Sequence, residues 1–382
     1  MDSTLQQITD RIRAATADGT ALRIRAGGSK DFYGESLQGE LLDLGAWHGI
    51  TSYEPTELVV TVRAGTSLAE LEAALAEKGQ CLPFEPPAFG ADSAATCGGM
   101  VAAGLSGPAR ASVGAVRDYV LGVTLINGRG ELLTFGGQVI KNVAGYDVSR
   151  LMVGALGTLG VLAEISLKVL PRAPAQATLR CAGIGQQAAL DLLNRWGGQP
   201  LPLNASCWLP DGVAGAPRGI LWVRLRGAVA AVDAASVRMS ADLQRCAGVV
   251  GRVDDAEAEV HWAACRDQTL PFFNAGAPEL GLWRLSVPQT APVLETPKPV
   301  LIEWHGAQRW LWAPASARET LRETAAKAGG SATLFRAPYA GEAGSAGRFH
   351  PLTPALQAIH RRLKHEFDPA GILNRARLYP DL

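Results

Sequence analysis

The sequence predicts an α+β protein with a glycine-rich first half and a second half in which strands and helices alternate. Glycine accounts for 43 of the 382 residues, above the usual share of about 7%, and it gathers between short β-rich runs in the first half. The stretch Pro171–Ala175 marks a change of composition and a predicted boundary. We expect domains at residues 1–172 and 173–347, followed by a C-terminal helix and tail at 348–382.

The composition argues against several classes of protein. Thirty-six Lys and Arg residues balance 36 Asp and Glu residues, so the chain lacks the electrostatic footprint of a nucleic-acid binder. The six cysteines include no CxxC pair, which predicts reduced thiols and no iron–sulfur cluster held by this chain alone. Residues 1–20 carry acids and no apolar core, which predicts an amphipathic helix rather than a secretion signal, and a cytoplasmic protein. Leu151–Leu170 contains Glu164 and Lys168, so we expect a turn and a strand there and no membrane span.

The first half is expected to fold as two small α+β subdomains. Ser67 is the predicted N-cap of a helix that reaches Lys78, with Glu70 completing a capping box and Gly79 ending the helix. Strands precede this helix, and the segment from Ala91 to Pro171 is dominated by strands. The predicted strands are Leu22–Arg25, Leu41–Leu44, Leu58–Val62, Leu121–Ile126 and Leu162–Leu170.

The second half alternates in two βαβ-like rounds. This order predicts an antiparallel sheet with helices on one face, similar to a duplicated ferredoxin-like layer. The predicted helices are Gln186–Trp196, Ala228–Cys246, Ser316–Ala328 and Leu356–Phe367. The predicted strands are Thr178–Ala182, Ile220–Arg226, Val249–Val253, Leu282–Val287, Val300–Trp304, Arg309–Ala313 and Ala332–Arg336.

The first of three glycine clusters, Arg25–Lys30 (RAGGSK), directly follows a predicted strand. Consecutive backbone N–H groups in such a loop form a concavity for phosphate oxygens, to which Ser29 adds a hydroxyl and Lys30 a charge. The loop is neither a Rossmann fingerprint nor a P-loop, because the chain contains no GxGxxG motif and no GKS or GKT. Taken alone, it would be read as a plain glycine turn.

Two further clusters favour a cofactor site. One follows Pro86-Pro87 and runs to Gly107, and the other is Gly154–Val161 (GALGTLGV). A tight hairpin would explain the last cluster by itself. Three glycine clusters with strands between them predict instead a backbone that approaches an extended, phosphate-bearing cofactor closely.

These segments resemble the FAD-binding domain of the vanillyl-alcohol-oxidase/p-cresol-methylhydroxylase (PCMH) superfamily, and within it the FAD-binding subunits of bacterial glycolate oxidase (glycolate dehydrogenase). The resemblance implies a PCMH-type FAD-binding domain of two α+β subdomains, a ferredoxin-like α+β cap domain, and a C-terminal tail that returns to the FAD-binding domain. The segments that carry it are Arg25–Lys30, Thr61–Leu71, Cys97–Gly107, Val139–Gly160, Glu303–Trp310 and Leu363–Asn374.

The same resemblance implies the contacts to FAD. Arg25–Lys30 would hold the pyrophosphate, Thr96–Gly104 would follow the diphosphate and ribityl chain, and Lys141–Tyr146 would lie near the isoalloxazine. Relatives with covalent flavin attach it through His or Cys, whereas this loop has Ser29 and Lys30, so the resemblance implies noncovalent FAD; Cys97 is the one thiol nearby. The implied cofactor-binding residues are Arg25, Ala26, Gly27, Gly28, Ser29, Lys30, Pro87, Thr96, Cys97, Gly98, Gly99, Ala102, Gly104, Gly107, Lys141, Tyr146, Gly157, Gly160 and Val161.

The chain departs from relatives that oxidise 2-hydroxy acids by themselves, because it lacks their His-rich metal motif (GHxGDGNxH and GEHG). His305 is the nearest approach and stands alone on a predicted strand. We therefore predict no metal ligands, and no catalytic base is identified. The tail also differs, since Asn374 precedes Arg375-Ala376 rather than Pro-Gly. Three arginines, Arg284, Arg309 and Arg336, could anchor an anionic substrate.

The resemblance implies an FAD-binding subunit of a complex that oxidises glycolate to glyoxylate. Its implied partners are a second FAD flavoprotein subunit and an iron–sulfur subunit, in the cytoplasm or at the inner membrane through those partners. Two alternatives stay open: a self-sufficient FAD-dependent 2-hydroxy-acid dehydrogenase, for example for D-lactate, and a structural subunit with a vestigial flavin site.

Overall fold

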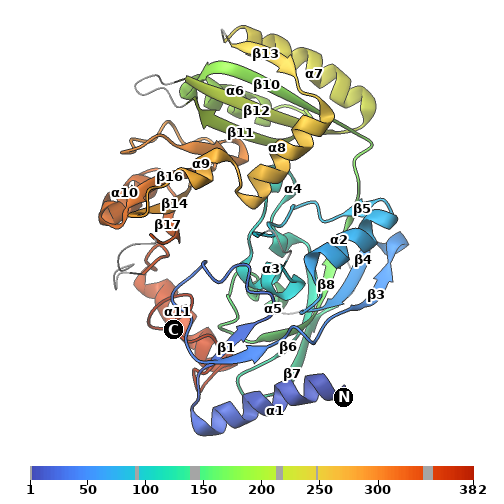
Figure 1. The fold of residues 1–382 in the computed structure, drawn as a ribbon, viewed down its shortest axis with the longest axis vertical. Coiled ribbons are helices and arrows are strands. Elements are labelled where there is room, and N and C mark those ends of the chain that lie inside the picture. The colour runs from blue at the N-terminus through green and yellow to red at the C-terminus, as the bar shows by residue number, and fades with distance from the viewer. Residues whose placement is uncertain (1, 91–93, 138–146, 212–217, 247, 339–346) are drawn as a thin grey trace. The chain divides into compact units, whose positions relative to one another are not determined.

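The computed structural model describes residues 2–90, 94–137, 147–211, 218–246, 248–338 and 347–382. The chain forms two compact units (Figure 1). The first comprises Met1–Ser106, Ala115–Pro171 and Gly347–Leu382, and the second comprises Gly107–Gly114 and Arg172–Ala346. The division after Pro171 lies beside the predicted boundary, whereas the sequence did not indicate that residues 107–114 join the second unit.

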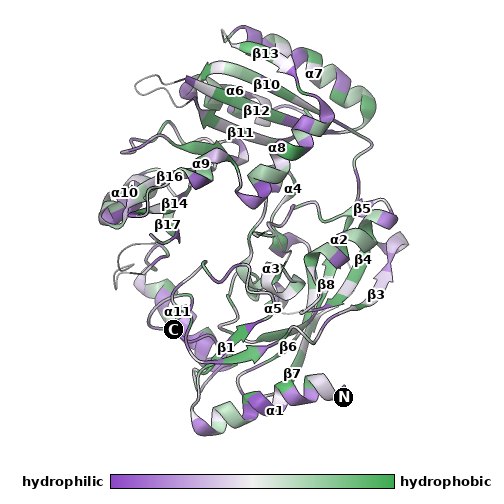
Figure 2. Ribbon diagram, in the orientation of Figure 1, coloured by the Kyte–Doolittle hydropathy of each residue, from purple (hydrophilic) through white to green (hydrophobic). Residues whose placement is uncertain are grey.

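A five-stranded antiparallel sheet in the order β3-β4-β8-β6-β7 forms the centre of the first unit. Figure 2 shows mostly hydrophobic colouring along β6 and β8. Two helices, α2 and α3, contribute Leu71, Leu75, Met100 and Val101 to the core beneath this sheet. The bounds are β3 Ile50–Glu54, β4 Val59–Arg63, β6 Val120–Ile126, β7 Leu132–Gly136, β8 Val161–Lys168, α2 Leu68–Glu77, α3 Cys97–Ala103 and α5 Val148–Leu151, with β5 (Gln80–Cys81) pairing with β9 (Leu170–Pro171).

The predicted subdomain division is only partly followed. Strand β4 was assigned to the first subdomain, but it pairs with β8 of the second in one sheet. Strands β3 and β7 were not predicted. The predicted helix after Ser67 is confirmed, because the Ser67 side chain accepts a hydrogen bond from the Glu70 N–H (3.1 Å).

A smaller parallel sheet of the first unit contains β1 (Leu22–Arg25) and β2 (Glu40–Asp43). Helix α1 (Ser3–Asp18) covers it with Ile8 and Ile12, which confirms the predicted amphipathic N-terminal helix. On its other side β1 meets the C-terminal tail, where Leu373 bridges to Leu22. The tail therefore extends the edge of this sheet.

The buried ammonium of Lys364 joins the tail to the rest of the first unit and forms an ion pair within the tail. Lys364, on α11 (Pro354–Phe367), lies 2.7 Å from the carboxylate of Asp368. Its ammonium also donates to the main-chain oxygens of Thr158 and Leu373, both at 2.8 Å. Burial lowers the pKa of Lys364, and the neighbouring Asp368 opposes that shift. All three ammonium donors thus have acceptors, as a buried charge requires.

The second unit is built on an eight-stranded sheet in the order β13-β10-β12-β11-β15-β16-β14-β17, with every pair antiparallel, as predicted. Helices α6, α7 and α10 pack on one face. The bounds are β10 Ala175–Gly185, β11 Leu203–Pro210, β12 Arg218–Gly227, β13 Val249–Arg252, β14 Leu280–Ser286, β15 Leu301–Glu303, β16 Gln308–Pro314, β17 Ser331–Arg336, α4 Arg110–Val113, α6 Gln186–Gly197, α7 Val229–Gln244, α8 Asp255–Asp267, α9 Pro271–Asn274 and α10 Arg318–Lys327.

The expectation that helices cover only one face of this sheet is wrong. Helix α8, which the sequence did not predict, packs on the second face. There the Trp262 indole donates to the hydroxyl of Thr178 on β10 (3.0 Å), and His261 stacks on Trp222 of β12. Strand β11 was also missed. Among the described residues, no helix combines the length and apolar character needed to cross a membrane.

Removing the Lys364 ammonium should loosen the tail. We expect Lys364→Met to lower the free energy of unfolding by about 3–5 kcal/mol, because the Asp368 carboxylate would be left buried without its partner. Urea denaturation followed by circular dichroism measures this loss. Arg361→Met, which removes the exposed Arg361–Asp381 pair (2.7 Å), is the matched control and should cost at most about 1 kcal/mol. Equal losses in the two variants would contradict a tail held by the buried pair.

Candidate functional site

The first unit contains a cleft with about 920 Å³ of atom-free space, counting the part open to solvent. Four segments line it: the loop Arg25–Asp31 after β1, the start of α3, the turn Ala155–Gly160 before β8, and the C-terminal tail through Asn374 and Arg377. The three glycine clusters predicted from the sequence all contribute to this one cleft.

The loop after β1 presents unused main-chain donors. Within the part of the chain that the structure describes, the N–H groups of Gly27, Gly28 and Ser29 donate no hydrogen bond. Gly27 also passes very close to another segment, since a Cβ atom there would lie 1.3 Å from the carbonyl oxygen of Ala94. Only glycine permits this approach. Successive free amides of this kind form a nest for phosphate oxygens.

The side chains of the loop hold its shape. The Arg25 guanidinium pairs with Asp31 at 2.8 Å, across the base of the loop. The Lys30 ammonium lies 3.2 Å from the Ser29 hydroxyl and 5.6 Å from the centre of the Phe89 ring. The cleft therefore combines amide donors with two cationic groups, which suits an anionic diphosphate.

Small residues at the other two segments let the backbone form the wall of the cleft. In α3, a Cβ at Gly98 would lie 2.8 Å from that of Ala64 on the preceding segment. The hydroxyl of Thr96 caps this helix by accepting the Gly99 N–H (3.3 Å). In the turn, Gly157 has a φ of +72°, a conformation that residues with a side chain rarely adopt.

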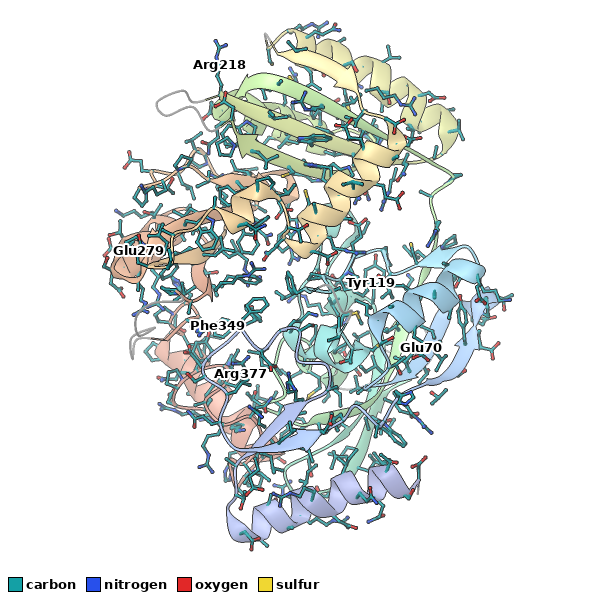
Figure 3. The ribbon with its side chains drawn as sticks, viewed as in Figure 1. Glu70, Tyr119, Arg218, Glu279, Phe349 and Arg377 are labelled. Atoms are coloured by element: carbon teal, nitrogen blue, oxygen red, sulfur yellow. The ribbon has the colours of Figure 1, made fainter. Side chains whose placement is uncertain are left out.

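The C-terminal tail supplies two lining residues that the sequence reasoning missed. Asn374 accepts a hydrogen bond from the Ile24 N–H (2.8 Å) and donates one to the Leu156 oxygen (2.6 Å). Arg377, labelled in Figure 3, donates to the main-chain oxygens of Asp31 (2.8 Å) and Tyr33 (2.5 Å). Burial lowers the pKa of Arg377 to about 10, so its guanidinium stays charged at neutral pH. The run LKHEFDPAGILN, which ends at Asn374, was a usable signal, because it already matched the family tail.

Twelve of the 19 predicted cofactor-binding residues line the cleft, five do not, and two lie outside the described residues. The lining residues come from the loop after β1, from α3 with its N-cap, and from the turn before β8. They are Arg25, Ala26, Gly27, Gly28, Ser29, Lys30, Thr96, Gly98, Gly99, Ala102, Gly157 and Gly160. Pro87, Cys97, Gly104, Gly107 and Val161 are absent from the lining, and Lys141 and Tyr146 lie outside the described residues.

Each of the five residues outside the lining has a structural role or position of its own. Cys97 and Val161 are buried in the core, and Pro87 is also buried. Gly104 ends α3 in a left-handed conformation (φ +64°). Gly107 belongs to the second unit, where its carbonyl accepts the Trp304 indole N–H (2.9 Å).

Cys97 is a poor candidate for covalent flavin attachment. Its side chain is 0% exposed. Burial raises the pKa of the thiol to about 12, with smaller contributions from Glu70 and Glu72. The nucleophilic thiolate is therefore disfavoured at neutral pH.

Two residues of the second unit that the sequence singled out, His305 and Arg309, have structural roles. His305 lies in a 3-10 turn rather than on a strand, and its two ring nitrogens contact the hydroxyls of Ser112 (3.0 Å) and Ser206 (2.9 Å). Burial lowers its pKa to about 4. Arg309 is fully buried and donates to the carbonyls of Ala291, Pro292 and Gly306. Both side chains therefore stabilise the fold of the second unit through these hydrogen bonds.

Comparison with known proteins agrees with the geometry of the cleft. Residues 3–136 match the FAD binding domain family. The chain is 43% identical to the glycolate oxidase subunit GlcE of Escherichia coli (strain K12), over 99% of this chain and 98% of that protein. It is 33% identical to the glycolate oxidase subunit GlcD of Bacillus subtilis (strain 168) over 34% of this chain, and it spans only 27% of that protein.

Solved structures confirm the PCMH-type fold. p-Cresol methylhydroxylase with substrate bound superposes with a TM-score of 0.73 at 13% identity, covering 99% of this chain and 87% of that one. Alkyldihydroxyacetonephosphate synthase gives a TM-score of 0.68 at 14% identity, covering 97% and 75%. The family match indicates FAD as the cofactor, and the free amides, cations and small residues of the cleft fit it.

A side chain at Gly27 should weaken FAD binding. In Gly27→Ala the new methyl group collides with the Ala94 oxygen, so the loop must move and its amides lose their alignment. We expect at least about tenfold weaker binding, which equals about 1.4 kcal/mol, measured by flavin fluorescence titration of the apoprotein. Gly197→Ala, where a Cβ meets nothing within 4 Å, is the control. Unchanged affinity in Gly27→Ala would rule out this loop as the phosphate site.

Proposed function

Because the chain belongs to the family of the glycolate oxidase subunit GlcE, we propose that it is the FAD-binding subunit of a glycolate-oxidising complex. The observation that carries this proposal is the 43% identity, which extends over nearly the full length of both proteins. The free amides of the loop after β1 support it independently, since they belong to the segment expected to hold the cofactor diphosphate.

When bound, FAD would supply the redox chemistry, by accepting and passing on the electrons of the oxidised 2-hydroxy acid. The residues of this chain bind and orient the cofactor. The amides of Gly27, Gly28 and Ser29 would hold the diphosphate, and Lys30 would add a positive charge beside it. Asn374 would keep the loop and the turn at a constant separation.

Among the residues that the structure describes, the lining of the cleft offers no evident base for the hydroxyl proton of the substrate. No histidine occurs among the described residues that line the cleft. The one carboxylate there, Asp31, is paired with Arg25. We therefore propose that a second FAD flavoprotein subunit performs the proton transfer and the metal-assisted chemistry.

The proposed partners are this second flavoprotein subunit and an iron–sulfur subunit. Support for the first comes from the similarity to both GlcE and GlcD, which are named as glycolate oxidase subunits. The iron–sulfur subunit follows from the need to carry electrons onward through a centre that this chain does not hold by itself. The proposed location is the cytoplasm, or the inner membrane through these partners.

We propose that FAD is bound noncovalently. Cys97→Ala should retain the full FAD content, because the thiol is buried in the core and does not line the cleft. Denaturation of the wild-type protein should release all of its flavin into the supernatant, measured by absorbance after precipitation. Flavin that stays with the precipitated wild-type chain and is released from Cys97→Ala would contradict this binding mode.

An anaerobic visible spectrum tests the proposed division of labour. We expect the purified chain to be yellow and to keep its flavin absorbance when glycolate is added. In the assembled complex, glycolate should bleach the flavin absorbance within the time of turnover. Free FAD with glycolate is the control for nonenzymatic reduction.

The rival functions give different spectra. Bleaching of the isolated chain by glycolate or D-lactate would establish a self-sufficient dehydrogenase. A colourless protein that takes up no FAD, yet still assembles with its partners, would establish a structural subunit. Either result would overturn the proposed function.

A further inference from the structure

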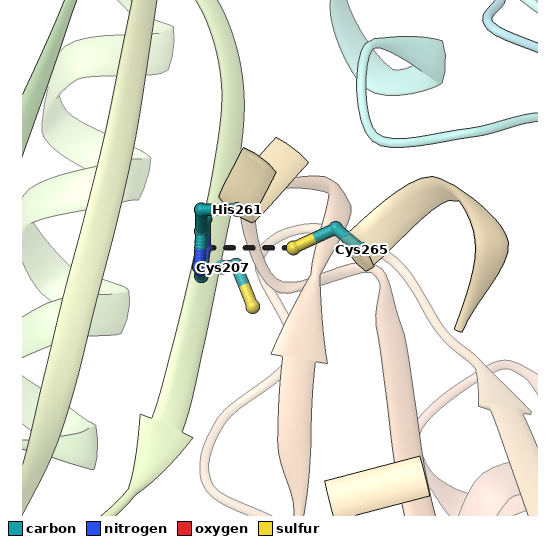
Figure 4. Close-up of side chains that lie close together, drawn as sticks. All are labelled: Cys207, His261 and Cys265. Atoms are coloured by element: carbon teal, nitrogen blue, oxygen red, sulfur yellow. Dashed lines mark hydrogen bonds between the residues drawn. The ribbon is translucent and has the colours of Figure 1, made fainter. Parts of the chain in front are cut away.

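A compact cluster of metal-ligating side chains lies in the second unit. It consists of Cys207 on β11 and of His261 and Cys265 on α8, all three buried. One ligand atom from each residue lies within 4.8 Å of the other two. Figure 4 shows the two thiols and the imidazole converging from the strand and the helix.

The distances match those of a mononuclear zinc site. Zn–S bonds of about 2.3 Å and Zn–N bonds of about 2.0–2.1 Å in a tetrahedron place neighbouring ligand atoms about 3.5–3.8 Å apart. The Nε2 atom of His261 and the Sγ atom of Cys265 are 3.5 Å apart. The same distance suits an S–H···N hydrogen bond, and a side-chain hydrogen bond also links Cys207 to Cys265. The feature that points to a metal site is the convergence of all three ligand atoms.

Helix geometry and packing hold the ligands in place. His261 and Cys265 are four residues apart on α8, so they lie on one face of the helix. The imidazole of His261 stacks on Trp222, with ring centres 3.7 Å apart and planes at 11°. Trp222 is the cross-strand partner of Cys207. The ring orientation and the position of the sulfur therefore depend on the same pair of strands.

The charge of the cluster also suits a divalent metal. One Zn²⁺ with two thiolates and a neutral imidazole has no net charge, which limits the cost of burial. The charged groups nearby are Arg180 and Arg224 beside His261, and Glu303, the cross-strand partner of Cys207.

We propose that Cys207, His261 and Cys265 bind one Zn²⁺ ion that attaches α8 to the second face of the eight-stranded sheet. Binding breaks two S–H bonds, forms two Zn–S bonds and one Zn–N bond, and releases two protons to solvent. The trio provides three of the four tetrahedral positions, and a water molecule would complete the set. All three side chains are buried, so the ion would link the strand to the helix inside the protein.

Metal titration of the full-length protein tests the site directly. The protein is treated with a chelator and dialysed, and Zn²⁺ is then added in competition with a chromophoric chelator. We expect one equivalent to bind and the melting temperature to rise. Co²⁺ as a probe should give the intense visible bands of tetrahedral cobalt and a thiolate-to-cobalt charge-transfer band in the near ultraviolet.

Variants separate the proposed ligands from other buried cysteines. Cys265→Ser and His261→Gln should each weaken Zn²⁺ binding by about 100-fold or more, since changes outside the ligand shell alone cost about 10–100-fold. Cys181→Ser is the matched control, because Cys181 is equally buried in the same sheet but belongs to the core on its opposite face. It should bind Zn²⁺ like the wild type.

Three results would overturn the proposal. The first is a wild-type protein, shown to be folded by circular dichroism, that gives no thiolate-to-cobalt band. The second is equal Zn²⁺ affinity in the wild type and in His261→Gln. The third is a disulfide between Cys207 and Cys265 in metal-free protein purified under reducing conditions. The first readout uses the unmodified chain, so it decides the matter even if the variants fail to fold.

Discussion

The side-chain amide of Asn374 joins two of the segments that form the FAD cleft. Its oxygen accepts the N–H of Ile24 at the end of β1, and its nitrogen donates to the carbonyl of Leu156 in the turn before β8. Both partners are main-chain atoms, so the separation of the loop and the turn depends on the backbone rather than on exchangeable side chains. The ion pair of Lys364 with Asp368 holds the start of this tail. The free amides of the loop can face a diphosphate only while these contacts last.

Local signals in the sequence predicted much of this arrangement. The structure contains the glycine loop after β1, the capped helix after Ser67, and the alternating strands and helices of the second half. Each of these features depends on residues that are close together in the sequence. Predictions for single residues were wrong where the position of the residue along a helix or strand decides whether it lines the cleft. Val161 was expected in the site, but its neighbour Leu162 lines the cleft, because successive residues of a strand face opposite sides. Gly104 resembles a binding glycine in sequence, yet its conformation serves to end a helix.

Features that depend on contacts distant in sequence could not be predicted. No local sequence pattern indicates the pairing of β4 with β8 or the hydrogen bond from Arg377 to the Tyr33 carbonyl. The same holds for the assignment of residues 107–114 to the second unit. Helix α8 escaped notice because its segment DAEAEVHWAACRD is rich in charge and its apolar stripe is narrow. That same helix brings His261 and Cys265 to Cys207, so a cluster that looks like three scattered residues in the sequence is compact in space.

The order of the two units along the chain constrains how the protein is made. The chain leaves the first unit after residue 106, returns at 115, leaves again after 171 and returns at 347. The edge of β1 is completed by Leu373, which follows the whole second unit in the sequence. During synthesis the residues of the second unit therefore emerge before β1 can gain this neighbour. A contiguous fragment that ends after Pro171 would lack Leu373. The edge of β1 would then be exposed, which promotes aggregation.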